Sequence, residues 1–82
     1  MSENRDIIHK IVTLCREKGF QNNEIYVIGC FAGSDEAEKV CGSTRASYEK
    51  CYEIIKSANT FADAIRKIEQ MQGIRYENRN QR

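Results

Sequence analysis

Hydrophobic residues recur at helical spacing from the start of the chain. Between residues 5 and 18 the apolar positions fall every three or four residues, at Ile7, Ile8, Ile11, Leu14 and Cys15. Charged residues lie mostly on the other side of such a helix, namely Arg5, Lys10, Arg16 and Glu17, which is the pattern of a helix that buries one face. Gly19 follows where a left-handed residue commonly ends a helix, and Phe20 is expected to fold back on that end. The first helix is therefore predicted over residues 5–18.

The segment over residues 23–32 has an ambiguous pattern. It contains four consecutive β-favouring residues, Ile25, Tyr26, Val27 and Ile28. Asn22 or Asn23 could equally cap a short buried helix, and periodicity does not separate the two structures. We favour a helix, because a single strand would have no partner with which to pair.

Three further helices are predicted from caps and periodicity. Hydroxylated residues begin them, namely Ser34, then Ser43 or Thr44, then Thr60. The first of the three is short and acidic and ends at Gly42, the second runs to about Ala58, and the third covers residues 61–72. Each of the two longer helices has an apolar stripe at 3.6-residue spacing.

Composition supports this all-helical prediction. The 82 residues include no proline and only five glycines, and 40% are hydrophobic, which favours helices over a turn-rich β fold. We predict an all-α fold, a compact bundle of four to five short helices over residues 1–74, followed by a flexible basic tail over residues 75–82. The first residues lack the features of an export signal, and no apolar run approaches the roughly 20 residues of a membrane span. A cytoplasmic protein without membrane contact is expected.

The two helices around Gly42 are predicted to form a helix-turn-helix unit. Such a unit needs two short helices, a tight turn and an apolar seam. The seam is expected from Ala37, Val40, Cys41, Tyr48, Cys51 and Ile55. The start of the second helix would then present side chains that reach base edges or phosphates, namely Ser43, Thr44, Arg45, Ser47 and Lys50. Arg45 is the strongest candidate, since a bidentate arginine–guanine contact contributes roughly 1–3 kcal/mol of discrimination.

The same stretch resembles the DNA-binding region of ParB-like plasmid and chromosome partition proteins and related plasmid regulators. The matching positions are Gly42, Ser43, Thr44, Arg45, Ser47, Tyr48, Glu49, Lys50, Ile54 and Ile55, then Ala64, Ile65, Ile68, Gly73 and Ile74. The resemblance covers about residues 35–74. Within these 82 residues we expect neither the family's nucleotide-binding domain nor its dimerisation domain, and Glu38 lies where helix packing usually requires a small residue. The resemblance implies sequence-specific DNA binding by an isolated domain, as in phage or plasmid regulators.

Charge is compatible with a DNA partner but leaves a protein partner open. The formal net charge is +1, and the basic excess lies in the second half of the chain. This is weaker than the charge of a dedicated nucleic-acid binder. The alternative is a small protein-binding module, such as a phage-type inhibitor or adaptor, with anchors at Tyr26, Phe31, Tyr52 and Tyr76. A palindromic DNA site would require a homodimer, for which the first helix or the tail is the expected surface.

The four cysteines and the one histidine favour no catalytic or metal site. In a reducing compartment the cysteines are expected to be buried thiols. Cys41 and Cys51 have nine residues between them, as in half of a twin-cysteine helical hairpin of the mitochondrial intermembrane space, so a disulfide-bonded hairpin is a second alternative. No two cysteines have metal-ligand spacing, and His9 has no predicted partner for nucleophilic catalysis. We expect no metal, no cofactor and no enzymatic activity.

Overall fold

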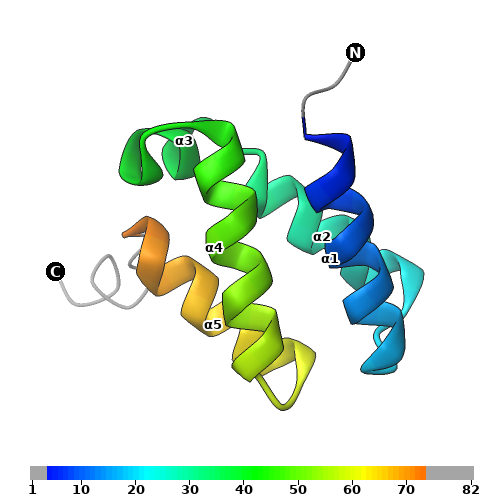
Figure 1. Ribbon diagram of the computed structural model, residues 1–82. Coiled ribbons are helices and arrows are strands. Elements are labelled where there is room, and N and C mark those ends of the chain that lie inside the picture. The colour runs from blue at the N-terminus through cyan, green and yellow to red at the C-terminus, as the bar shows by residue number, and fades with distance from the viewer. Residues whose placement is uncertain (1–3, 74–82) are drawn as a thin grey trace, which may run out of the picture.

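The computed structural model describes residues 4–73, which form helices joined by short turns (Figure 1). The helices are α1 (Arg5–Glu17), α2 (Asn22–Ala32), α3 (Asp35–Cys41), α4 (Thr44–Ser57) and α5 (Phe61–Gln72). The predicted all-α bundle is confirmed, and the ambiguous segment is helix α2. The predicted tail, residues 75–82, and Tyr76 lie outside the described residues.

The end of α1 shows how local sequence fixes a helix boundary. Gly19 has φ +88°, its N–H donates to the carbonyl of Arg16, and the N–H of Phe20 donates to the carbonyl of Cys15, both at 3.0 Å. These two bonds form a Schellman motif, which satisfies carbonyls that the helix leaves unpaired. Phe20 is thereby turned into the core, where its ring packs edge-on against Phe61 at 5.9 Å between centroids.

Side-chain caps begin the later helices as the sequence predicts. In each case the hydroxyl oxygen of the capping residue accepts a hydrogen bond from the backbone N–H three residues later in the chain. The capping residues are Ser34, Ser43 and Thr60. Helix α2 differs, because the backbone N–H of Gln21 donates to the Glu24 carboxylate at 2.9 Å. The N-cap of α2 is therefore Gln21, one residue before Asn22, the first of the two predicted candidates. The carboxylate of Glu24, in the first turn of the helix, completes the cap.

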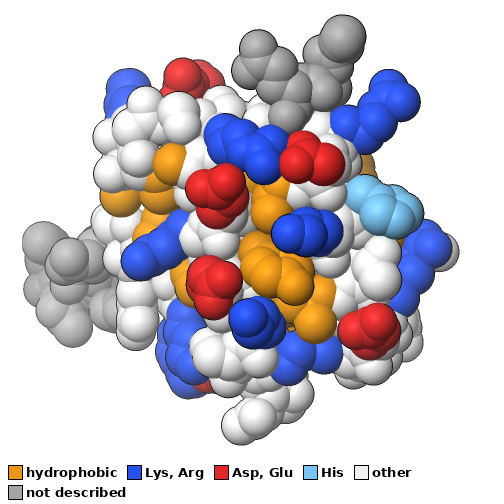
Figure 2. Space-filling view, in the orientation of Figure 1, with side chains coloured by type: hydrophobic (Ala, Val, Ile, Leu, Met, Phe, Trp, Pro, Cys, Tyr) orange, Lys and Arg blue, Asp and Glu red, His pale blue; other side chains and the backbone are white. Residues whose placement is uncertain are grey.

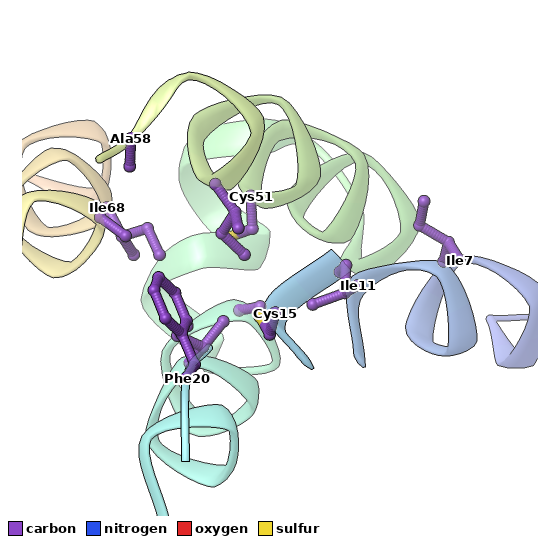
Figure 3. Packing of buried hydrophobic residues seen from close by; sticks show 11 residues of the cluster. Ile7, Ile11, Cys15, Phe20, Cys51, Ala58 and Ile68 are labelled. Carbon is purple, nitrogen blue, oxygen red and sulfur yellow. The ribbon is translucent and has the colours of Figure 1, made fainter. Parts of the chain in front are cut away.

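Helix α4 occupies the centre of the bundle. It packs against α1, α2, α3 and α5, and in Figure 1 α1 and α5 flank it while α3 lies across its first turn. The core beneath it is small and mostly aliphatic. Figure 3 shows Cys15, Phe20, Cys51 and Ile68 converging on one space from α1, the turn after it, α4 and α5. All of these side chains are buried.

The predicted seam between α3 and α4 is only partly correct. Ala37, Cys51 and Ile55 are fully buried, as expected. Val40, however, is 54% exposed, and the prediction that it faces the core is wrong. The reason is that α3 has only seven residues and lies across the first turn of α4, so Ala37 is the residue that it buries.

The cysteines differ in exposure, which gives a prediction for thiol chemistry. Cys15 and Cys51 are buried as expected, but Cys30 is exposed and Cys41 is half-buried, and all four are free thiols. Burial raises the pKa of Cys15 to about 11 and that of Cys51 to about 12. Because the thiolate is the reactive species, these two thiols should be inert at pH values near 8.

We expect a colorimetric thiol reagent to modify Cys30 rapidly in the folded protein and to reach Cys15 and Cys51 only after unfolding. Cys41, whose sulfur lies 3.4 Å from that of Met71, should react more slowly than Cys30. Variants Cys30→Ser and Cys51→Ser identify the fast and the protected thiol. Two reactive thiols after unfolding without reductant, in place of four, would instead reveal the disulfide-bonded hairpin.

Candidate nucleic-acid interface

The two helices predicted on either side of Gly42 are present as α3 and α4. The backbone at Gly42 has φ +97°, and its N–H donates to the carbonyl of Glu38 at 2.8 Å, which ends α3. Ser43 then accepts the N–H of Ala46 at 3.1 Å, which begins α4. Glycine suits this turn because a side chain strains a backbone with positive φ. Helices α3 and α4 therefore meet at a two-residue turn.

The five predicted contact residues have three different environments. Ser43 is exposed, but its hydroxyl is used as a cap. Thr44 is half-buried beside it, and the Arg45 side chain is 41% exposed. Lys50 is exposed one and a half turns further along α4. The structure thus brings the first three together at the start of α4 and keeps Lys50 on the surface.

Ser47 is not on this surface, and the prediction that it is exposed is wrong. Its side chain has 0% exposure, and its hydroxyl donates to the carbonyl of Ala32 at 2.6 Å. Ser47 precedes Cys51 by four residues, so both lie on the face of α4 that packs into the bundle. The hydroxyl satisfies a carbonyl at the end of α2 that the helix itself leaves unpaired. The role of Ser47 is therefore to join α4 to α2.

Arg45 is held by two carboxylates. Its terminal nitrogens donate to the two oxygens of Asp6 at 2.8 and 3.0 Å, and its Nε donates to Glu49 at 3.2 Å. The first pair is a bidentate contact that joins α1 to the first turn of α4. It lowers the pKa of Asp6 to about 2. Any contribution of this pair is present above the usual carboxyl pKa and is lost as the pH falls towards 2.

Charge over the helix pair is nearly balanced. Residues 35–57 hold four basic residues, Lys39, Arg45, Lys50 and Lys56, and five acidic ones, Asp35, Glu36, Glu38, Glu49 and Glu53. Figure 2 shows the same mixture on the face of α1 and α4, where basic and acidic side chains alternate around an apolar strip. This surface does not attract phosphates strongly by charge alone.

The aromatic residues that could anchor a protein partner are unequally exposed. Tyr52 is half-buried, with the ammonium groups of Lys10 and Lys56 at 5.8 and 5.7 Å from its ring centre. Phe31 is half-buried against the core. Tyr26, in contrast, is 73% exposed on α2. Of the three candidates in the described part, Tyr26 is the one available to a partner.

Residues 4–73 contain neither a cluster of metal ligands nor a membrane-spanning helix. No group of three His, Cys, Asp or Glu side chains there is placed to hold a metal ion. No helix in this range is long and apolar enough to cross a membrane.

Comparisons with known proteins add no assignment. No family model matches this chain, and no curated protein or solved structure matches it.

Proposed function

We propose that this chain binds duplex DNA through α3 and α4, with the first turn of α4 directed into the major groove. The observation that supports the proposal is the helix pair itself, in which a glycine turn presents the start of α4 at the surface. In Figure 1 no helix lies in front of α4. Arg45 and Lys50 then supply one side chain for a base edge and one for a phosphate.

The ion pair of Arg45 and Asp6 is compatible with this role. The two terminal nitrogens of Arg45 donate in parallel to two carboxylate oxygens, and guanine offers two acceptors, O6 and N7, in a similar arrangement. Asp6 therefore occupies the same two donors of Arg45 that a guanine would use. Since both side chains are solvent-exposed, the pair contributes little to stability and can be exchanged for a base.

Because the charge of the helix pair is nearly balanced, we expect the affinity for DNA to depend only weakly on salt concentration. The logarithm of the binding constant falls linearly with the logarithm of the salt concentration, and the slope is about −0.9 for each phosphate that the protein neutralises. Lys50 and Lys56 are the exposed lysines of α4. We therefore expect a shallow salt dependence, with a slope of about −2, and an affinity that depends strongly on Arg45.

The proposal is tested by selecting duplexes from a random pool with the purified chain and titrating the enriched sequence at several salt concentrations. Arg45→Ala should weaken binding to that sequence by about 10-fold to 100-fold. Arg66→Ala is the matched control, because Arg66 is also exposed and also pairs with an aspartate, Asp63, but lies on α5. It should leave binding unchanged.

Asp6→Asn removes one partner of Arg45 and should tighten binding several-fold. Asp63→Asn changes the net charge equally at a distance from α4, so it separates the loss of the Arg45 partner from a general charge effect. A pool without enrichment, or equal binding by the wild type and Arg45→Ala, would refute the proposed function.

A further inference from the structure

The outward face of α2 differs from every other helix face in the described part of the chain. Its exposed positions are Asn22, Asn23, Tyr26, Gly29 and Cys30, none of which is charged. The exposed positions of α1, α3, α4 and α5 all include charged residues. The one charged residue of α2, Glu24, is half-buried and bonded to the N–H of Gln21. In a chain with 30% charged residues, this leaves an uncharged face.

A large aromatic side chain stands on this face beside an apolar hollow. Tyr26 is 73% exposed, more than Val40 at 54% or Ile8 at 36%. Gly29 on the same face and Ile25, the residue before Tyr26, help to line a hollow of about 40 Å³ between α1 and α2, together with Ile8 and Val12. A protruding tyrosine and an adjacent apolar hollow are the two parts that a tightly packed interface brings together.

Gly29 provides an independent observation. The other four glycines have a reason within the fold, since Gly19, Gly42 and Gly73 have positive φ and a side chain at Gly33 would lie 3.0 Å from the Tyr48 hydroxyl. A Cβ added at Gly29 would meet nothing within 4 Å. Glycine within a helix is less favourable than alanine. The fold of one copy therefore gives no reason for a glycine here, whereas the close approach of another backbone from outside would give one.

We propose that this face binds the same face of a second copy of the chain, so that two α2 helices cross near Gly29 in a twofold-symmetric dimer. In such an interface each patch meets itself, so a charge near the axis opposes a like charge. The uncharged face of α2 satisfies this condition. Tyr26 of each copy would pack over the hollow beside Ile8 of the other. The inference depends on α2 and is independent of DNA binding.

The dimer is tested first by measuring mass against concentration, using sedimentation equilibrium or light scattering. The wild type should be dimeric at micromolar to millimolar concentrations. Tyr26→Asp should be monomeric in the same range, because it removes the anchor and places two carboxylates across the interface. Val40→Asp adds the same charge to an exposed apolar position on α3 and should remain dimeric. Circular dichroism establishes that both variants are folded.

Gly29→Ala separates an interface role from a structural one. In the isolated chain there is space for the methyl group, so the variant should melt at the same temperature or higher when measured at concentrations that favour the monomer. Its dimer dissociation constant should rise at least tenfold, because the methyl groups keep the helices apart. A Gly29→Ala protein that dimerises like the wild type would overturn the proposed crossing.

Cys30 gives a direct measure of proximity. It follows Gly29 on the exposed side of α2, so a crossing there brings the two Cys30 thiols close together. Oxidation by copper(II)-phenanthroline, which takes one electron from each thiol as its proton leaves, should yield a disulfide-linked dimer. Cys30→Ser should yield none. The inference would be refuted by a wild-type protein that stays monomeric at all concentrations. This holds even if the monomer binds a different protein through Tyr26.

Discussion

A lysine in place of Ser47 is expected to unfold the domain or to lower its free energy of unfolding by about 3–5 kcal/mol, the usual cost of a buried charge without a partner. Ser47 has 0% exposure, and its hydroxyl donates to the carbonyl of Ala32. A lysine at this position would place an ammonium group between α4 and α2 and would exceed the available volume. Domains of this size have roughly 5–15 kcal/mol of stability, so the loss is a large share of it.

The matched control is Ser57→Lys, which makes the same change on the same helix. Ser57 is exposed in the last turn of α4, where a positive charge is favourable beside the helix C-terminus. Its free energy of unfolding should change by less than about 0.5 kcal/mol. Urea denaturation followed by circular dichroism measures both variants. If Ser47→Lys were as stable as the wild type, Ser47 would have to face solvent and the packing of α4 on α2 would be wrong.

The helix boundaries were predictable because short-range chemistry determines them. The last helix was expected over residues 61–72 and is observed over Phe61–Gln72. Thr60 caps its start through the N–H of Asp63, and Gly73 ends it with φ +80°. Both signals involve residues within a few positions of the boundary, so they can be recognised without any knowledge of tertiary packing.

The environment of the predicted contact residues was less predictable, because it depends on neighbours distant in sequence. Asp6 binds Arg45 although 39 positions separate them, and no periodicity relates two residues on different helices. Ser47 is a different case. Its spacing from Cys51 and Ile55 placed it on the buried face of α4, but its polar type led to the opposite prediction. Periodicity was the better guide, since a buried serine can donate to a carbonyl at a helix end.

The uncharged face of α2 could not be predicted until the choice between helix and strand was made for this segment. Its consecutive β-favouring residues are compatible with either structure, and only a helix places Tyr26, Gly29 and Cys30 on one face. Once the segment is known to be a helix, Ile28 lies in the core, and Tyr26 and Cys30 lie outside. The sequence suggested α1 or the tail as a surface for a dimer, because which side of α2 is covered depends on the positions of α1, α4 and α5.

Truncation of Ile55 to alanine is the second change expected to have a large effect. Ile55 lies on α4, which packs against four other helices, and its side chain is fully buried in the common core. Ile55→Ala should lower the free energy of unfolding by about 2–5 kcal/mol, through lost burial and the cavity left behind. Ile55→Val, which removes one methylene, should cost about 0.5–1.5 kcal/mol.

Ile8→Ala on α1 is the control for Ile55→Ala, because it deletes the same atoms from a side chain that is 36% exposed. We expect a smaller loss of stability, since the remaining space is open to water and no closed cavity forms. Denaturant unfolding at matched protein concentration measures the free energy of unfolding of Ile55→Ala, Ile55→Val and Ile8→Ala. The concentration must be low enough that dimerisation through α2 does not add to the measured stability. Equal losses for Ile8→Ala and Ile55→Ala would mean that α4 does not hold the core together. The larger loss at Ile55 is expected because its contacts join several helices, so the cavity weakens all of them at once.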